Sequence, residues 1–155
     1  MKSTTLSLAL VAMVYLAIGS SITAAQDRGT GVGIVLGEPT GFSFKHWINE
    51  DEAYDAGLAW SYVKGTSMHI HADYLVHHRV QATSRLSLPY YYGVGGRLKT
   101  IEKETRLGLR CVVGVDFMLP KDPVDIFIEF APILDLAPAT ELSFNAGVGV
   151  RYFFE

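Results

Sequence analysis

Arg106 to Met118 reads RLGLRCVVGVDFM, and its residues alternate in character from one position to the next. The apolar set is Leu107, Leu109, Cys111, Val113, Val115 and Phe117. The positions that alternate with it include Arg106, Gly108, Arg110, Gly114 and Asp116. Successive side chains of a β-strand point to opposite faces, so this stretch predicts a strand with one apolar face and one face of glycines and charges.

The same period of two recurs along the chain in segments of about ten residues that are separated by turn-rich breaks. Eight segments follow the pattern, at 29–36, 40–47, 53–63, 66–78, 89–98, 106–118, 124–134 and 141–154. The polar stretch HRVQATSRLS predicts that 78–88 is the longest link between them. No helix is expected beyond residue 28, and a chain of 155 residues is short for two domains.

Glycines concentrate on the polar face of these segments. The set includes Gly57, Gly93, Gly95, Gly108, Gly114, Gly147 and Gly149. On a solvent-facing sheet a glycine weakens the strand and gains nothing, whereas the interior of a closed eight-stranded barrel is so narrow that small residues must alternate with large ones. The sequence therefore predicts an all-β chain, an eight-stranded antiparallel up-and-down transmembrane barrel whose apolar face meets lipid.

Ionisable side chains on the inward row predict a polar network in the lumen of this barrel. Its members are Lys45, Asp55, His69, His71, Asp73, Arg97, Arg106, Arg110, Asp116, Asp125, Glu129 and Arg151. The set holds five basic and five acidic residues, a balance expected of buried ion pairs, while an ion-selective pore usually carries an excess of one sign. We therefore expect a plugged lumen.

The first 25 residues, MKSTTLSLALVAMVYLAIGSSITAA, combine one basic residue, an uncharged apolar run and a tail of small residues. This pattern predicts a secretory signal peptide over 1–25, which leaves 26–155 as the barrel domain. An uncleaved membrane anchor is the alternative, but the apolar run is shorter than the roughly 20 residues that a spanning helix needs. Without Lys2, 12 basic residues remain against 16 acidic ones, and no basic patch indicates nucleic acid as a partner.

Aromatic residues near the ends of the predicted strands favour a membrane location. They are Trp47, Tyr54, Tyr62, Tyr74, Tyr90, Tyr152 and Phe154. Aromatic rings of membrane proteins gather at the two interfaces between lipid and water. Together with the export signal, they predict a bacterial outer-membrane protein.

Several stretches also resemble an uncharacterised family of small predicted outer-membrane β-barrel proteins of diderm bacteria. They are GVGIVLGEPTGFSFKHW, DAGLAW, HIHADYLVHH, YYYGVGGRL, RLGLRCVVGVDFMLPKDPVDIFIEFAPILDLAPATELSF and NAGVGVRYFF. The resemblance covers nearly the whole mature chain and implies a barrel of the size of the OmpA transmembrane domain or OmpX, with no assigned activity. It also implies that Tyr152 and Phe154 form the C-terminal signal read by the outer-membrane assembly machinery, although Glu155 follows them.

Four histidines lie within ten residues of one another, in HIHADYLVHH. His69, His71 and Asp73 share one face of the strand and are the metal candidates. We expect these side chains instead to fill the lumen and hydrogen-bond there, so no metal or cofactor is predicted. His77 and His78, at the end of the segment, are expected to be solvated.

No catalytic signature is present, and we expect no enzymatic activity. The Gly-x-Ser-x-Gly motif of many serine hydrolases does not occur. A structural or surface-interaction role is therefore the primary prediction, with short outer loops, a monomeric state, and lipid and an unidentified external protein as partners. Two alternatives stay open: a soluble periplasmic barrel of lipocalin type that binds a hydrophobic ligand, and an outer-membrane enzyme that modifies lipids.

Overall fold

The chain folds into eight β-strands. The structure, a computed structural model, describes residues 29–61, 67–83, 86–101, 104–119 and 122–154, without the side chains of 79–88. The predicted signal peptide and Tyr62 lie outside these residues. The strands are β1 Thr30–Glu38, β2 Thr40–Trp47, β3 Glu52–Ser61, β4 Ser67–Thr83, β5 Leu86–Ile101, β6 Glu104–Met118, β7 Val124–Ala137 and β8 Glu141–Phe154.

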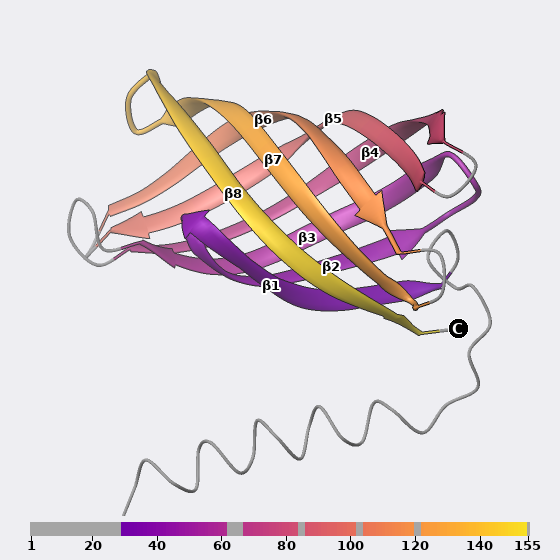
Figure 1. The fold of residues 1–155 in the computed structure, drawn as a ribbon. Coiled ribbons are helices and arrows are strands. Elements are labelled where there is room, and N and C mark those ends of the chain that lie inside the picture. The colour runs from indigo at the N-terminus through magenta and orange to yellow at the C-terminus, as the bar shows by residue number, and fades with distance from the viewer. Residues whose placement is uncertain (1–28, 62–66, 84–85, 102–103, 120–121, 155) are drawn as a thin grey trace, which may run out of the picture.

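Each strand pairs antiparallel with its neighbours in sequence, and β1 also pairs with β8, so the sheet closes into a barrel (Figure 1). The closing register runs from the Thr30 and Phe154 pair to the Glu38 and Ala146 pair. The predicted eight-stranded antiparallel up-and-down barrel is confirmed. The described residues contain no helix with the length and apolar character of a membrane span.

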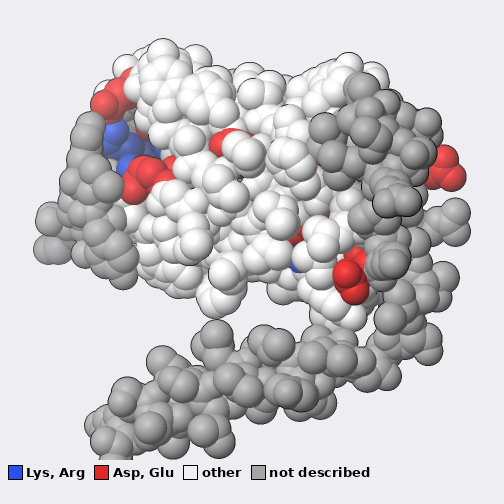
Figure 2. Space-filling view, viewed as in Figure 1, with Lys and Arg blue, Asp and Glu red and all other residues white. Residues whose placement is uncertain are grey.

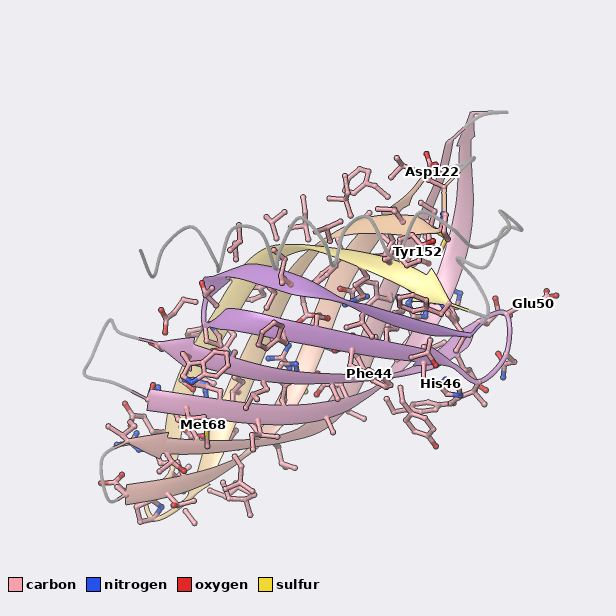
Figure 3. All side chains as sticks on the ribbon, turned by 90° about the horizontal axis from the view of Figure 1, so that it is seen from below. Phe44, His46, Glu50, Met68, Asp122 and Tyr152 are labelled. Carbon is pink, nitrogen blue, oxygen red and sulfur yellow. The ribbon has the colours of Figure 1, made fainter. Side chains whose placement is uncertain are left out.

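The barrel has two distinct ends. At the terminal end, β1 begins, β8 finishes and the turn at 48–51 joins β2 to β3; at the opposite end, Pro39 joins β1 to β2 and residues 138–140 join β7 to β8. In Figure 3, Glu50, Asp122 and Tyr152 lie toward the terminal end and Met68 toward the opposite one.

The outer face of the wall is apolar over all eight strands. Leu109, Val113 and Ile128, from β6 and β7, are each at least half exposed. In Figure 2 the visible wall is mostly free of charged side chains, which gather mainly toward the ends. The structure therefore places the apolar row on the outside of the barrel. A carrier with an apolar ligand cavity would need that row on the inside.

The lumen is crowded, and glycines make room for the large side chains that cross it. Gly57 lies opposite His71, Gly114 opposite Glu129 and near the Tyr91 ring, and Gly149 opposite Phe127. A Cβ atom on any of the three glycines would fall 2.3 Å from an atom of the neighbouring ring. Such contacts are far inside van der Waals distance, which accounts for the glycine row on the inward face.

At the terminal end of the barrel, Trp47, Ala53, Met118 and Phe153 form a buried hydrophobic cluster. Trp47 was expected among the interfacial aromatics of the outer surface, and this expectation is wrong, because only 5% of its surface is exposed. Trp47 is two residues after Lys45 on β2, so its side chain also points inward, and β2 extends to this residue.

The predicted link at 78–88 is mostly strand, a second correction. β4 continues to Thr83 and β5 begins at Leu86, and Arg79 to Thr83 pair only with residues of β5. The β4–β5 hairpin is therefore longer than its neighbours, and its backbone hydrogen bonds do not depend on an apolar row. For this reason the period-two pattern did not indicate the extra strand residues.

Crowding predicts a large effect of one added methyl group. Gly149→Ala would set a Cβ 2.3 Å from the Phe127 ring and 2.6 Å from the Ile34 carbonyl oxygen, and we expect it to lower the free energy of unfolding by about 1–3 kcal/mol. Gly96→Ala is the control, because its Cβ meets no heavy atom closer than 3.9 Å and the change should stay within about 0.5 kcal/mol. Urea unfolding in detergent micelles measures both; equal effects would contradict a crowded lumen.

Candidate functional site

The candidate site is the set of ionisable side chains in the lumen. Lys45, Asp55, His69, Asp73, Arg97, Arg110, Asp116, Asp125 and Arg151 are buried, and His71 and Glu129 are nearly so. Arg106 lies apart from them at the opposite end, with 29% of its side chain exposed, and contacts Glu104 and Glu141. Arg106 therefore belongs to the rim and does not contribute to the charge balance of the interior.

Arg151 on β8 is the hub of the network. Its Nη2 lies 2.9 Å from Asp55 Oδ2, its Nη1 lies 3.6 Å from Asp125 Oδ2, and its Nε donates to Ser43 Oγ at 2.9 Å. The guanidinium also stacks 3.7 Å above the centre of the Phe127 ring. One cation thus joins strands β2, β3, β7 and β8 across the lumen.

A second group surrounds Arg110 on β6. Its Nε donates to Asp73 Oδ2 at 2.8 Å, and its Nη2 contacts Glu129 Oε1. The Tyr91 hydroxyl donates to the other Glu129 oxygen at 3.1 Å. Charge-assisted hydrogen bonds of this kind offset the cost of removing the ions from water.

Nearer the terminal end, Lys45 Nζ donates to Asp116 Oδ2 at 2.6 Å, with both side chains fully buried. The ammonium lies 4.6 Å from the centre of the Trp47 ring, in the range of a cation–π contact. His77 Nε2 is 3.4 Å from the same carboxylate oxygen. The expectation that His77 is solvated is wrong: its ring is 1% exposed and packs between Trp47 and Tyr91.

Toward the opposite end, Arg97 donates through Nη2 to both oxygens of Asp135, at 2.5 and 2.7 Å, and to Ser143 Oγ at 3.0 Å. The sequence reasoning missed Asp135 because it ended the seventh strand at Leu134. β7 continues to Ala137, which carries Asp135 into the lumen. Its spacing of six residues from Glu129 keeps the inward parity, and this was the signal that could have found it.

The histidines of β4 do not form the metal-ligand group that their spacing in the sequence suggested. His69 Nε2 lies 3.2 Å from the Ser67 hydroxyl oxygen. Among the described residues, His69 does not belong to a cluster of possible metal ligands. His71 and Asp73 instead come together with Asp55 of β3, with one ligand atom from each within 4.8 Å of the others. His78 is exposed on the outer wall, stacked on Tyr90 and Tyr92.

A small cavity penetrates the lumen beside these groups. It has a volume of about 30 Å³ and is lined by residues that include Glu38 and Pro39 at the opposite end and Asp55, His71 and Arg110 deeper in. A volume of this size holds about two water molecules. The cavity therefore has room for solvent beside the ionised groups.

Comparisons with known proteins identify the fold. No model of a known protein family matches the chain, and a search of curated proteins finds no match. Among solved structures, the chain is similar to the crystal structure of the N-terminal β-barrel domain of Pseudomonas aeruginosa OprF, with a TM-score of 0.62 and 12% identity over 81% of this chain and 95% of that one. At this identity the likeness concerns the barrel fold, and membership of the uncharacterised family stays a prediction.

Removal of the hub cation tests the network. Arg151→Met would leave Asp55, Asp116 and Asp125 without their shared guanidinium in a buried site, and we expect a loss of roughly 3–5 kcal/mol in the free energy of unfolding. The matched control is Arg106→Met at the rim, where a partly exposed pair contributes about 1 kcal/mol or less. Urea titration followed by tryptophan fluorescence measures both; comparable losses would argue against Arg151 as a buried hub.

Proposed function

We propose that the protein is an integral outer-membrane β-barrel with a plugged, ion-paired lumen and a structural or surface-interaction role. The observation that carries the proposal is the opposition between the two faces of the wall. Leu109 is 57% exposed on the outside, while its neighbour Arg110 is 2% exposed on the inside.

The apolar face is too extensive for a protein surrounded by water. Exposed large hydrophobic side chains occur on every strand, as Ile34, Phe42, Leu58, Ile70, Val94, Leu109, Ile128 and Val148 exemplify. Soluble monomers rarely expose contiguous apolar patches above a few hundred Å². A closed barrel satisfies the backbone hydrogen bonds of its wall, which is the condition for strands to cross lipid. An outer-membrane location also agrees with the export signal expected at 1–25.

The contents of the lumen support a plug. The cluster of Trp47, Ala53, Met118 and Phe153 lies across the terminal end, and buried ion pairs of Arg151, Arg110 and Arg97 bridge strands above it. A residual cavity of about 30 Å³ is too small for a hydrated ion to pass.

A role without catalysis is part of this proposal, as expected from a sequence without a Gly-x-Ser-x-Gly motif. The proposed partners are outer-membrane lipid, the assembly machinery that would read Tyr152 and Phe154, and an external protein still to be identified. We propose a monomer, because the outer wall is apolar all round and the sheet has no free edge.

The two tryptophans test insertion into lipid, since they lie on opposite faces of the wall. Trp60 packs edge-on against Phe42 of the outer row, and Trp47 is buried inside. In vesicles of brominated phospholipid we expect strong quenching of Trp60 in the Trp47→Phe variant and much weaker quenching of Trp47 in the Trp60→Phe variant. The reverse order, or no quenching of either residue, would contradict a membrane barrel with this orientation.

The plug predicts the electrical behaviour of the purified protein. In planar bilayers we expect no reproducible conductance steps, because no continuous water path crosses the lumen. Flotation of the same preparation with liposomes verifies that the protein has inserted. Stable, repeated steps would show a pore and would rule out the plugged lumen while leaving the membrane location intact.

A further inference from the structure

The interior of the barrel carries more negative than positive charge. Among the described lumen residues that are buried or nearly so, the carboxylates are Asp55, Asp73, Asp116, Asp125, Glu129 and Asp135, and the cations are Lys45, Arg97, Arg110 and Arg151. Lys99 shares the inward parity of Arg97 but is only partly buried, toward the opposite end. Six acids against four bases leave a formal charge of −2 with the histidines neutral. The balance read from the sequence is lost because Arg106 lies at the rim and Asp135 lies inside.

Three lumen side chains from two neighbouring strands are placed as ligands for a cation. Asp55 of β3 and His71 and Asp73 of β4 bring one ligand atom each within 4.8 Å of the others. Tetrahedral zinc with bonds of roughly 2.0–2.2 Å holds its ligand atoms about 3.4 Å apart, so small side-chain rotations would close the trio around an ion. Imidazole with carboxylates is a donor set typical of first-row transition metals.

Three atoms of this trio are buried without a hydrogen-bond partner. They are Asp73 Oδ1, in a side chain with no exposed surface, His71 Nδ1, in a side chain that is nine-tenths buried, and Asp55 Oδ2, which lies 2.9 Å from Arg151 Nη2 without making a hydrogen bond. His71 Nε2 approaches Asp55 Oδ1 only to 3.8 Å. Other buried polar atoms of the lumen, such as His69 Nδ1, are also unpaired, but in the trio the unpaired atoms belong to residues whose ligand atoms converge, which fits a bound ion.

The surroundings orient the ligands. Asp55 Oδ2 faces Arg151 and Asp73 Oδ2 accepts from Arg110, which leaves the second oxygen of each carboxylate for an ion. Gly57 and Gly95 lie directly opposite His71 and Asp73 on the adjacent strands, where a Cβ would come within 2.3 Å and 2.1 Å of them. Partners that hold metal ligands in this way are a regular part of metal sites.

Neither arginine repels a cation as strongly as its charge suggests. Arg110 also contacts Glu129, and Arg151 also faces Asp116 and Asp125, so acids outnumber bases around the trio. Asp55 and His71 line the cavity that reaches toward Glu38 and Pro39, which gives water a place as the fourth ligand. We propose that Asp55, His71 and Asp73 bind one divalent first-row transition-metal ion, with Zn²⁺ as the representative, inside the barrel.

Zinc binding by the untagged, folded protein in detergent tests the proposal. We expect one Zn²⁺ per wild-type barrel by titration calorimetry and metal analysis. In His71→Gln we expect an affinity more than about 100-fold weaker, which exceeds the roughly 10- to 100-fold cost of losing a residue that only supports a ligand. His69→Gln is the matched control, because it removes a buried imidazole of the same strand that lies outside the trio. It should bind as the wild type does. The mobility of unheated samples on gels verifies that each variant is folded.

Several results would overturn the proposal: no stoichiometric Zn²⁺ in the wild type, equal affinity in His71→Gln, or an equal loss in His69→Gln. Tighter binding of Ca²⁺ or Mg²⁺ than of Zn²⁺ would also overturn it, since it would mean an oxygen site without the imidazole. Should His71→Gln fail to fold, Co²⁺ titration of the wild type decides, because imidazole ligation gives hyperfine-shifted ring N–H signals in NMR. Absence of those signals would exclude His71 as a ligand.

Discussion

The hydrogen-bonded pairing of β1 with β8 is the constraint on which the rest of the structure depends. Closing the sheet at eight strands leaves a lumen about as wide as the side chains that point into it. Several large residues enter opposite a position that has no side chain, as with Phe127 opposite Gly149 and His71 opposite Gly57. Closure also turns every other residue outward, which creates the continuous apolar wall.

Crowding determines the electrostatics of the interior. Few waters can enter, so each buried ion must be stabilised by other side chains. Arginine suits this task because its planar fork reaches several acceptors at once, and Arg151 reaches Asp55, Asp125 and Ser43. In the plugged lumen that we propose, the packing that pairs the charges would also fill the cross-section. The excess of carboxylates makes the interior a place for a cation.

Much of this arrangement could be predicted from alternation alone. The period of two in 106–118 assigns Leu109 to one face and Arg110 to the other, and this holds whatever the neighbouring strands are. Errors concentrate where alternation has no apolar row to follow. The paired residues at 79–88 lie in a stretch that reads as a polar link. Asp135 lies in a strand end that reads as a turn. Trp47 follows the inward parity of its strand, although an aromatic residue near a strand end suggested the membrane interface.

The sequence by itself determined the number of strands, their antiparallel order and the face on which most side chains lie, because these follow from local periodicity and from short connections. Only the tertiary structure decided which inward residues meet. Strand tilt and stagger bring together residues far apart in the chain, such as Lys45 with Asp116 and Arg97 with Asp135. The pairing of β3 with β4 likewise brings Asp55 to His71 and Asp73, while His69 lies outside that group. Such contacts depend on register and shear, which a single strand does not encode.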